Sequence, residues 1–329
     1  MSNNSSFGNL FKFAGPEVAE KVLPVNGGAV FRCSYPKDFN DPYELFLSID
    51  RHETPELLAF YADVVGDLPQ IPTTCFSRSP IVLPMWAHYA SNGSGFVVEV
   101  DESRIVARFP KAGFGDVDYR DAADPELNSL LERAHETTKP RHTYILRDAV
   151  FSAAYYTKAN CWSHEQERRL VAGDASVRMS GDLMLLDVPP DAVRRLIAGP
   201  SSSDRLKAFL REAAARLGCG FLKMRRARTS TRPYFVDSHA ATQVFEAPTF
   251  VEVVSCCEGC GEPIDGDGTR CSLCSVDREH REWAARRNPY RMLQDTGLLD
   301  GYIANMNGIR KGSRDPKTKG SCIYDSIRP

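Results

Sequence analysis

Four cysteines in the C-terminal third of the chain have the spacing of a metal site. Cys257 and Cys260 form one C-x-x-C pair, and Cys271 and Cys274 form a second pair after a gap of ten residues. A two-residue gap lets both thiolates of a pair face one ion, and four thiolates satisfy the tetrahedral preference of zinc. The sequence therefore predicts a structural zinc site. Cys256 is a less favoured alternative to Cys257, because it would lengthen the gap to three residues.

Two acids, Glu165 and Glu167, stand at the start of an expected strand. Residues two apart in a strand face the same side, so both carboxylates would lie on one face. Fixed anions in a partly dry cleft can stabilise positive charge that develops on a reacting carbon. The other interpretation is structural, with the two acids in scaffold ion pairs with Lys158, Arg168 or Arg169.

The elements that must position these residues are short strands with helices interspersed irregularly. Strands are expected at residues 10–13, 29–33, 73–77, 95–100, 115–120, 149–156, 168–172, 184–188 and 243–254. Helices are expected at residues 54–65, 124–135, 190–197 and 203–217. This pattern predicts an α+β fold with a mixed or antiparallel sheet core and flanking helices, plus a small zinc-ribbon segment.

The domain organisation follows from the same pass along the chain. We expect an α+β domain over residues 8–250, a zinc ribbon over 251–276, a helical segment over 277–306 and a disordered, Gly/Lys-rich tail over 307–329.

Bulk composition excludes some classes of protein. The chain has 329 residues and a formal net charge of −2, so charge alone indicates no partner class. It has no apolar run of membrane-spanning length and its first residues are polar, which predicts no membrane contact, no secretory signal and a cytoplasmic location.

Several motifs in the N-terminal 250 residues occur together in a fixed order. They are LFKF at 10–13, FNDPYE at 39–44, CFS at 75–77, MWAHYA at 85–90 followed by GF at 95–96, and Lys158 followed by WSHEQERRL at 162–170. In combination and order they resemble the bacterial family called domain of unknown function 2971, over residues of about 8–250. The zinc ribbon lies outside this resemblance, as an addition.

The two glutamates also resemble, distantly, the Glu-x-Glu element of ADP-ribosyltransferases. That resemblance implies that Glu167, the second glutamate, engages the nicotinamide ribose of NAD, with Glu165 beside it. It further implies a basic residue on the first strand and a Ser or Thr on a middle strand. Lys12 or Arg32 would supply the first, and Thr74 or Ser77 the second. Side chains that could stack on nicotinamide are Trp86, His88 and Tyr89.

Two hypotheses of function follow. The first is an NAD-using, ADP-ribosyltransferase-like enzyme, a toxin or phage-defence effector that modifies a protein or nucleic acid. The second is a non-enzymatic interaction module for nucleic acid or protein, built from the zinc ribbon and the arginine-rich segment 278–291, where Trp283 and Tyr290 are interleaved. Acidic residues in that segment offset its charge, so an ordinary solvated helix is the alternative.

Overall fold

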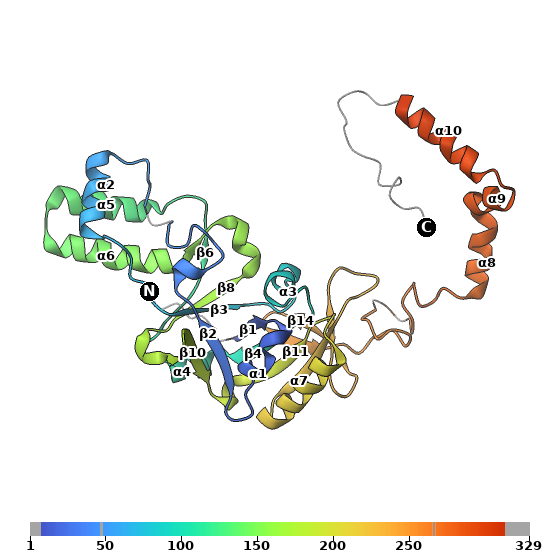
Figure 1. The fold of residues 1–329 in the computed structure, drawn as a ribbon, viewed down its shortest axis with the longest axis horizontal. Helices are drawn as coiled ribbons and strands as arrows, with labels where there is room; N and C mark the ends of the chain where they lie inside the picture. The colour runs from blue at the N-terminus through green and yellow to red at the C-terminus, as the bar shows by residue number, and fades with distance from the viewer. Residues whose placement is uncertain (1–7, 47–48, 265, 267, 313–329) are drawn as a thin grey trace. The chain divides into compact units, whose positions relative to one another are not determined.

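The computed structural model of the chain describes residues 8–46, 49–264, 266 and 268–312. The chain folds as two compact units, Met1–Thr269 and Arg270–Pro329 (Figure 1). Helices and strands alternate irregularly along the first unit, so the prediction of an α+β fold is confirmed.

A mixed sheet runs through the first unit and has ten strands among the residues described. Their spatial order is β15 (Thr249–Glu252), β14 (Thr242–Glu246), β13 (Tyr234–Val236), β12 (Gly220–Arg225), β11 (Val193–Ala198), β4 (Phe96–Asp101), β1 (Asn9–Ala14), β3 (Thr73–Ser77), β8 (Glu167–Val171) and β5 (Gly113–Asp116). Neighbours are antiparallel except β11 and β12, which are parallel. Helix α7 (Asp204–Leu217) makes the crossover that a parallel pair requires.

Smaller sheets and helices cover both faces of the large sheet. Three strands form a second sheet, in the order β2 (Ala29–Cys33), β10 (Leu183–Val188) and β9 (Arg178–Ser180), and β6 (Asp118–Tyr119) pairs with β7 (Thr157–Lys158). One core cluster joins the second sheet to the large sheet, α7, and α4 (Glu102–Arg108), with α1 (Ala19–Val22) at its edge. A second cluster packs α3 (Leu83–Tyr89) against the other face, through Phe11, Trp86 and Phe235.

Three further helices have a core of their own. They are α2 (Pro55–Val64), α5 (Pro125–Thr137) and α6 (Pro140–Tyr155), which lie together at one end of the first unit (Figure 1). The expected strand at 149–156 is wrong, because this stretch is the second half of α6. Its buried residues recur every four positions at His142, Leu146, Val150 and Ala154, which is the period of a helix.

The expected helix at 190–197 is also wrong. Only residues 190–192 form a short 3-10 turn, and Val193–Ala198 is strand β11. β11 lies between β4 and β12, where Leu196, Ile197 and Ala198 are all buried. A strand covered on both faces carries a continuous apolar run, which local periodicity cannot distinguish from a buried helix.

The second unit contains three helices among its described residues, α8 (Arg278–Arg287), α9 (Pro289–Asp295) and α10 (Leu299–Gly312). They lie where a helical segment was expected. The tail expected at 307–329 begins inside α10, so residues 307–312 are helical, and 313–329 lie outside the described residues.

Candidate functional site

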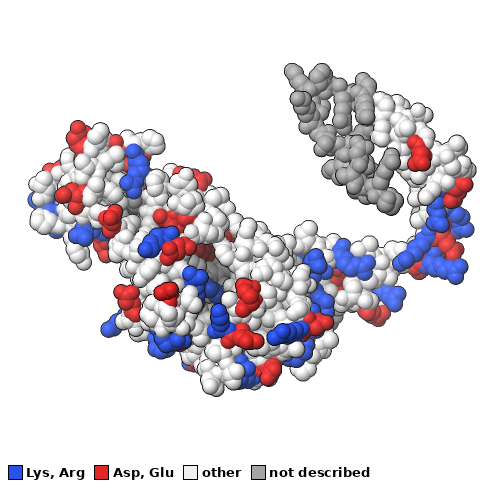
Figure 2. Space-filling model, viewed as in Figure 1, with Lys and Arg blue, Asp and Glu red and all other residues white. Residues whose placement is uncertain are grey.

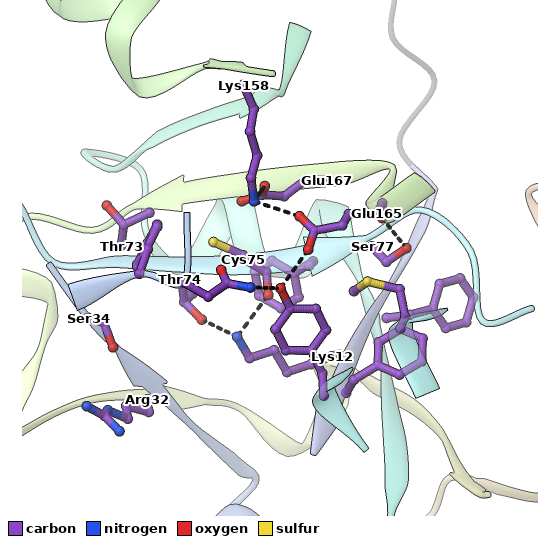
Figure 3. A pocket seen from close by; sticks show the side chains of 17 residues that line it. Lys12, Arg32, Ser34, Thr73, Thr74, Cys75, Ser77, Lys158, Glu165 and Glu167 are labelled. Carbon is purple, nitrogen blue, oxygen red and sulfur yellow. Dashed lines mark hydrogen bonds and ion pairs between the residues drawn. The ribbon is translucent and has the colours of Figure 1, made fainter. Parts of the chain in front are cut away.

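The site is a cavity of about 380 Å³ where the large sheet splits. β1 pairs with β4 along six positions but with β3 at one, Phe11 opposite Ser77. Beyond that position β1 and β3 diverge, and Lys12 reaches across, where its amine donates to Thr74 Oγ1 and to the Cys75 carbonyl, both at 2.9 Å (Figure 3). The divergence of strands β1 and β3 therefore creates the space that the cavity occupies.

Glu165 and Glu167 both line this cavity, and their side chains are buried, with 3% and 5% exposure. They do not share a strand as expected. Glu165 ends the 3-10 helix η3 (Asn160–Glu165), and Glu167 begins β8. Gln166 between them has a positive φ of 47°, in the left-handed region. This turn, and not the alternation of side chains along a strand, brings both carboxylates to the cavity.

A buried ion-pair network surrounds the two glutamates. Lys158 Nζ lies 2.7 Å from Glu165, 3.4 Å from Glu167 and 3.7 Å from Glu44. The Arg169 guanidinium, fully buried, donates two hydrogen bonds to Glu44 and two to Glu167. Three carboxylates thus share two cations in this network.

The pKa values of two acids in the network are shifted in opposite directions. Burial by itself raises the pKa of Glu167, but the attraction and hydrogen bonds of Arg169, together with Lys158, outweigh it and lower the pKa to about 2. For Glu44 burial dominates, and its pKa is raised even though Arg169 opposes the shift. Glu167 is therefore an ionised carboxylate at neutral pH.

Glu165 is also held by two neutral side chains, Tyr89 and Asn40, which form a short hydrogen-bonded chain. The Tyr89 hydroxyl donates to Glu165 at 2.6 Å, and the Asn40 amide donates to the same hydroxyl at 2.7 Å. Burial, followed by the hydrogen bond to Glu165, raises the pKa of Tyr89, so the phenol stays protonated and remains a donor.

The structure brings most of the predicted site residues together. Lys12, Arg32, Ser77 and Tyr89 line the cavity with the two glutamates. Ser77 Oγ donates to the Glu165 carbonyl at 2.7 Å and so holds the turn that carries both acids.

Two predicted residues lie away from this cavity. Trp86 is buried in the core, where its indole N–H donates to the Pro80 carbonyl and its ring meets Phe13 edge-on. His88 is exposed. Helix α3 turns Met85 and Tyr89 toward the cavity instead, since they are four residues apart.

The structural interpretation of the two acids predicted ion-pair partners among Lys158, Arg168 and Arg169. Lys158 and Arg169 do pair with the glutamates of the cavity. Arg168 pairs instead with Glu102 and Asp116, because alternate residues of β8 face opposite sides of the sheet.

The motif at residues 39–44 contributes a turn and also part of the site. Asp41 accepts a hydrogen bond from the Tyr43 amide, which makes the Asx turn. The same segment also delivers Phe39 and Asn40 to the cavity lining and Glu44 to the network. The presence of the motif was the sequence feature that marked this segment for attention. Nothing in the spacing of its residues indicated that Glu44 would contact Arg169.

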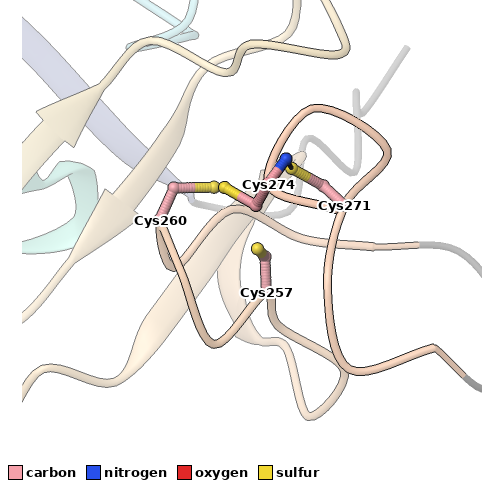
Figure 4. A group of neighbouring side chains, drawn as sticks. All are labelled: Cys257, Cys260, Cys271 and Cys274. Atoms are coloured by element: carbon pink, nitrogen blue, oxygen red, sulfur yellow. Dashed lines mark hydrogen bonds between the residues drawn. The ribbon is translucent and has the colours of Figure 1, made fainter. Parts of the chain in front are cut away.

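The four cysteines of the predicted metal site form one cluster. The sulfur atoms of Cys257, Cys260, Cys271 and Cys274 all lie within 4.8 Å of one another (Figure 4). Tetrahedral zinc with bonds of about 2.3 Å places its sulfurs about 3.8 Å apart, so this donor set fits such an ion. Gly261 has a φ of 77°, which supports the tight turn expected after the first pair.

The arginine-rich segment of the second unit is exposed along its length. In α8, Arg278 pairs with Glu282, and Arg287 lies over the Trp283 ring at 4.6 Å. Figure 2 shows basic and acidic side chains intermixed on this helix. Across the described part of the chain, none of the helices combines the length and apolar character that crossing a membrane requires.

Comparison with known proteins gives one match. No curated protein and no solved structure matches the chain. A family model described as "Protein of unknown function (DUF2971)" matches residues 85–170, a stretch that includes Tyr89, Lys158, Glu165 and Glu167. The predicted resemblance to the domain of unknown function 2971 is confirmed over that stretch.

Proposed function

We propose that the chain transfers the ADP-ribosyl group of NAD to an acceptor in the cavity at the split between β1 and β3. The observation that carries this proposal is the spatial order β1–β3–β8, which places Lys12, Thr74 and Glu167 on three adjacent strands around one cavity. This is the arrangement implied by the resemblance to ADP-ribosyltransferases, with a basic first strand, a hydroxyl-bearing middle strand and a glutamate at the start of the third.

The chemistry needs a fixed anion, and Glu167 provides one. When the bond between the ribose carbon and the nicotinamide nitrogen breaks, the electron pair of that bond goes to the nitrogen and neutralises the ring. Positive charge then develops on the ribose carbon. An ionised carboxylate in a partly dry cavity stabilises that charge. Arg169 and Lys158 keep Glu167 ionised.

Glu165 has the complementary role of proton acceptor. The nucleophile of the acceptor forms its new bond to the ribose carbon and loses a proton, which Glu165 can take. Tyr89 and Lys158 fix its two oxygens, so the carboxylate is held in one orientation before the substrate binds. The Lys12 amine at the split could donate to the pyrophosphate of NAD, although burial lowers the pKa of this lysine.

A purely structural ion-pair network is the competing account of Glu167. It explains the pairing with Arg169 but gives no reason for the network to face a cavity of 380 Å³, which lies in the size range of small-molecule sites.

The test is transfer of label from radiolabelled NAD to a cell lysate. Wild-type protein should label an acceptor and consume NAD, and Glu167→Gln should abolish both. Glu99→Gln is the matched control, because Glu99 is also buried and accepts two hydrogen bonds from one arginine, Arg195, but lies outside the cavity lining. Equal activity in wild type and Glu167→Gln would refute the proposal.

We also propose that the four-cysteine cluster holds zinc as a structural ion. Four thiolates and no open position leave the metal without a site for substrate, which is the pattern of structural zinc. Thiolate ligands must stay reduced, which suits the cytoplasmic location expected from the sequence.

A further inference from the structure

A second cavity, of about 480 Å³, lies on the other side of α3 in the first unit. Its lining includes Trp86 of α3 together with Arg226 and Ser230 from the segment that follows β12. Helix α3 turns Met85 and Tyr89 toward the first cavity, so the two cavities share this helix as a wall.

The segment at residues 223–232 beside this cavity is strongly basic. Its sequence, KMRRARTSTR, has five lysines and arginines and no acid. Arg225 and Arg226 are exposed, and among the described residues Arg226 has no hydrogen bond or ion pair. Loss of hydration lowers the pKa of Lys223, and the positive charge of Arg225 lowers it further. Like charges held together in this way attract a polyanion.

The cavity's lining favours nucleic acid over other polyanions. Trp86, Met224 and Pro233 supply apolar surface, and Ser230 and Thr231 supply hydroxyls. An apolar hollow with polar groups at its edge suits an unstacked base, whose edge needs hydrogen-bond partners, while arginines beside it suit the phosphates. We propose that this cavity and the segment 223–232 bind single-stranded nucleic acid.

Glu262, which lies close after the first cysteine pair in the sequence, holds the basic segment in place. The Glu262 carboxylate, buried next to that pair, accepts hydrogen bonds from the Arg228 amide at 2.6 Å and from Thr229 Oγ1 at 3.2 Å. The Tyr234 hydroxyl donates to the Cys260 carbonyl at 3.0 Å. The segment on which binding depends is therefore anchored to residues beside the first cysteine pair.

Binding is independent of the transferase chemistry and is measured without NAD. Fluorescence anisotropy with a labelled single-stranded oligonucleotide of about 12 nucleotides, over a series of salt concentrations, gives the affinity and its salt dependence. Arg226→Ala should weaken binding about tenfold and reduce the slope of log K against log salt by about one, as expected for one lost phosphate contact.

The control is Arg286→Ala, which removes an exposed arginine from α8 in the other unit and should leave binding unchanged. Loss of affinity in Arg286→Ala but not in Arg226→Ala would overturn the proposal and move the contact to α8. Tighter binding to a duplex of the same sequence, or binding only to vesicles of anionic lipid, would overturn it as well.

A second experiment tests the anchoring role of Glu262. Glu262→Ala, with metal content and melting temperature checked, should weaken oligonucleotide binding at least fivefold because the basic segment loses its anchor. Unchanged affinity in this variant would refute the anchoring role. Since neither measurement involves NAD, failure here and failure of the proposed transferase activity are distinguishable.

Discussion

Replacement of Glu167 by glutamine should destabilise the protein by an amount that depends on pH. The folded structure lowers the pKa of Glu167 from 4.5 to about 2. Since a tenfold change in proton affinity is worth about 1.4 kcal/mol, this corresponds to about 3 kcal/mol of stability at neutral pH. Removing one partner of a buried ion pair costs a similar amount, about 3–5 kcal/mol.

The sign of the pH dependence follows from the direction of the shift. A carboxyl group whose pKa is lowered by folding contributes its full stability above its ordinary pKa of 4.5, and loses it as pH falls toward the folded value of about 2. The difference in unfolding free energy between wild type and Glu167→Gln should therefore be constant from pH 7 to about 5. It should then shrink progressively at lower pH.

The assay is urea unfolding of both proteins at a series of pH values, followed by intrinsic fluorescence. Glu99→Gln is again the control, with the opposite expectation: burial raises the pKa of Glu99 despite Arg195, so protonation favours the folded wild type. The difference between wild type and Glu99→Gln should grow as pH falls through the raised pKa that Glu99 has in the folded protein. Parallel profiles for the two variants, or a Glu167→Gln difference that persists unchanged to pH 3, would refute the reasoning.

Three further predictions concern the cavity and the metal site. Tyr89→Phe removes the hydrogen bond to Glu165, and transferase activity should fall about tenfold while the free energy of unfolding changes by about 1–2 kcal/mol, measured by urea titration. Lys12→Met removes the amine that spans the split, so the KM for NAD should rise more than kcat falls in steady-state assays. Cys271→Ser removes one sulfur of the cluster. Elemental analysis of the purified protein should find about one zinc per wild-type chain and clearly less in the variant. Equal zinc content in the two proteins would contradict the four-sulfur site.

The sequence predicted those elements whose local pattern matches their environment. Helix α2 begins where Thr54 caps it and Pro55 opens its first turn, and α7 ends at Gly218, which has a φ of 65°. Strand β11 was mistaken for a helix because its pairing between two central strands, and not its periodicity, decides its conformation.

The candidate site was predictable in its parts but not in its assembly. The motif around Glu165 and Glu167 indicated acids that act together, and four cysteines at metal-ligand spacing indicated their own cluster. The split between β1 and β3 was not predictable, since it depends on strand pairing across more than 60 residues of sequence. Glu44 reaches Arg169 across 125 residues, and no local pattern encodes a contact of that range.

Nicotinamide release from NAD, measured by chromatography with purified protein and no added acceptor, tests the central claim most directly. Wild-type protein should release nicotinamide measurably, kcat should fall about 100-fold or more in Glu165→Gln and in Glu167→Gln, and Glu99→Gln should change it little. Absence of release by wild-type protein with a full complement of metal, or an equal rate in all three variants, would contradict the central claim.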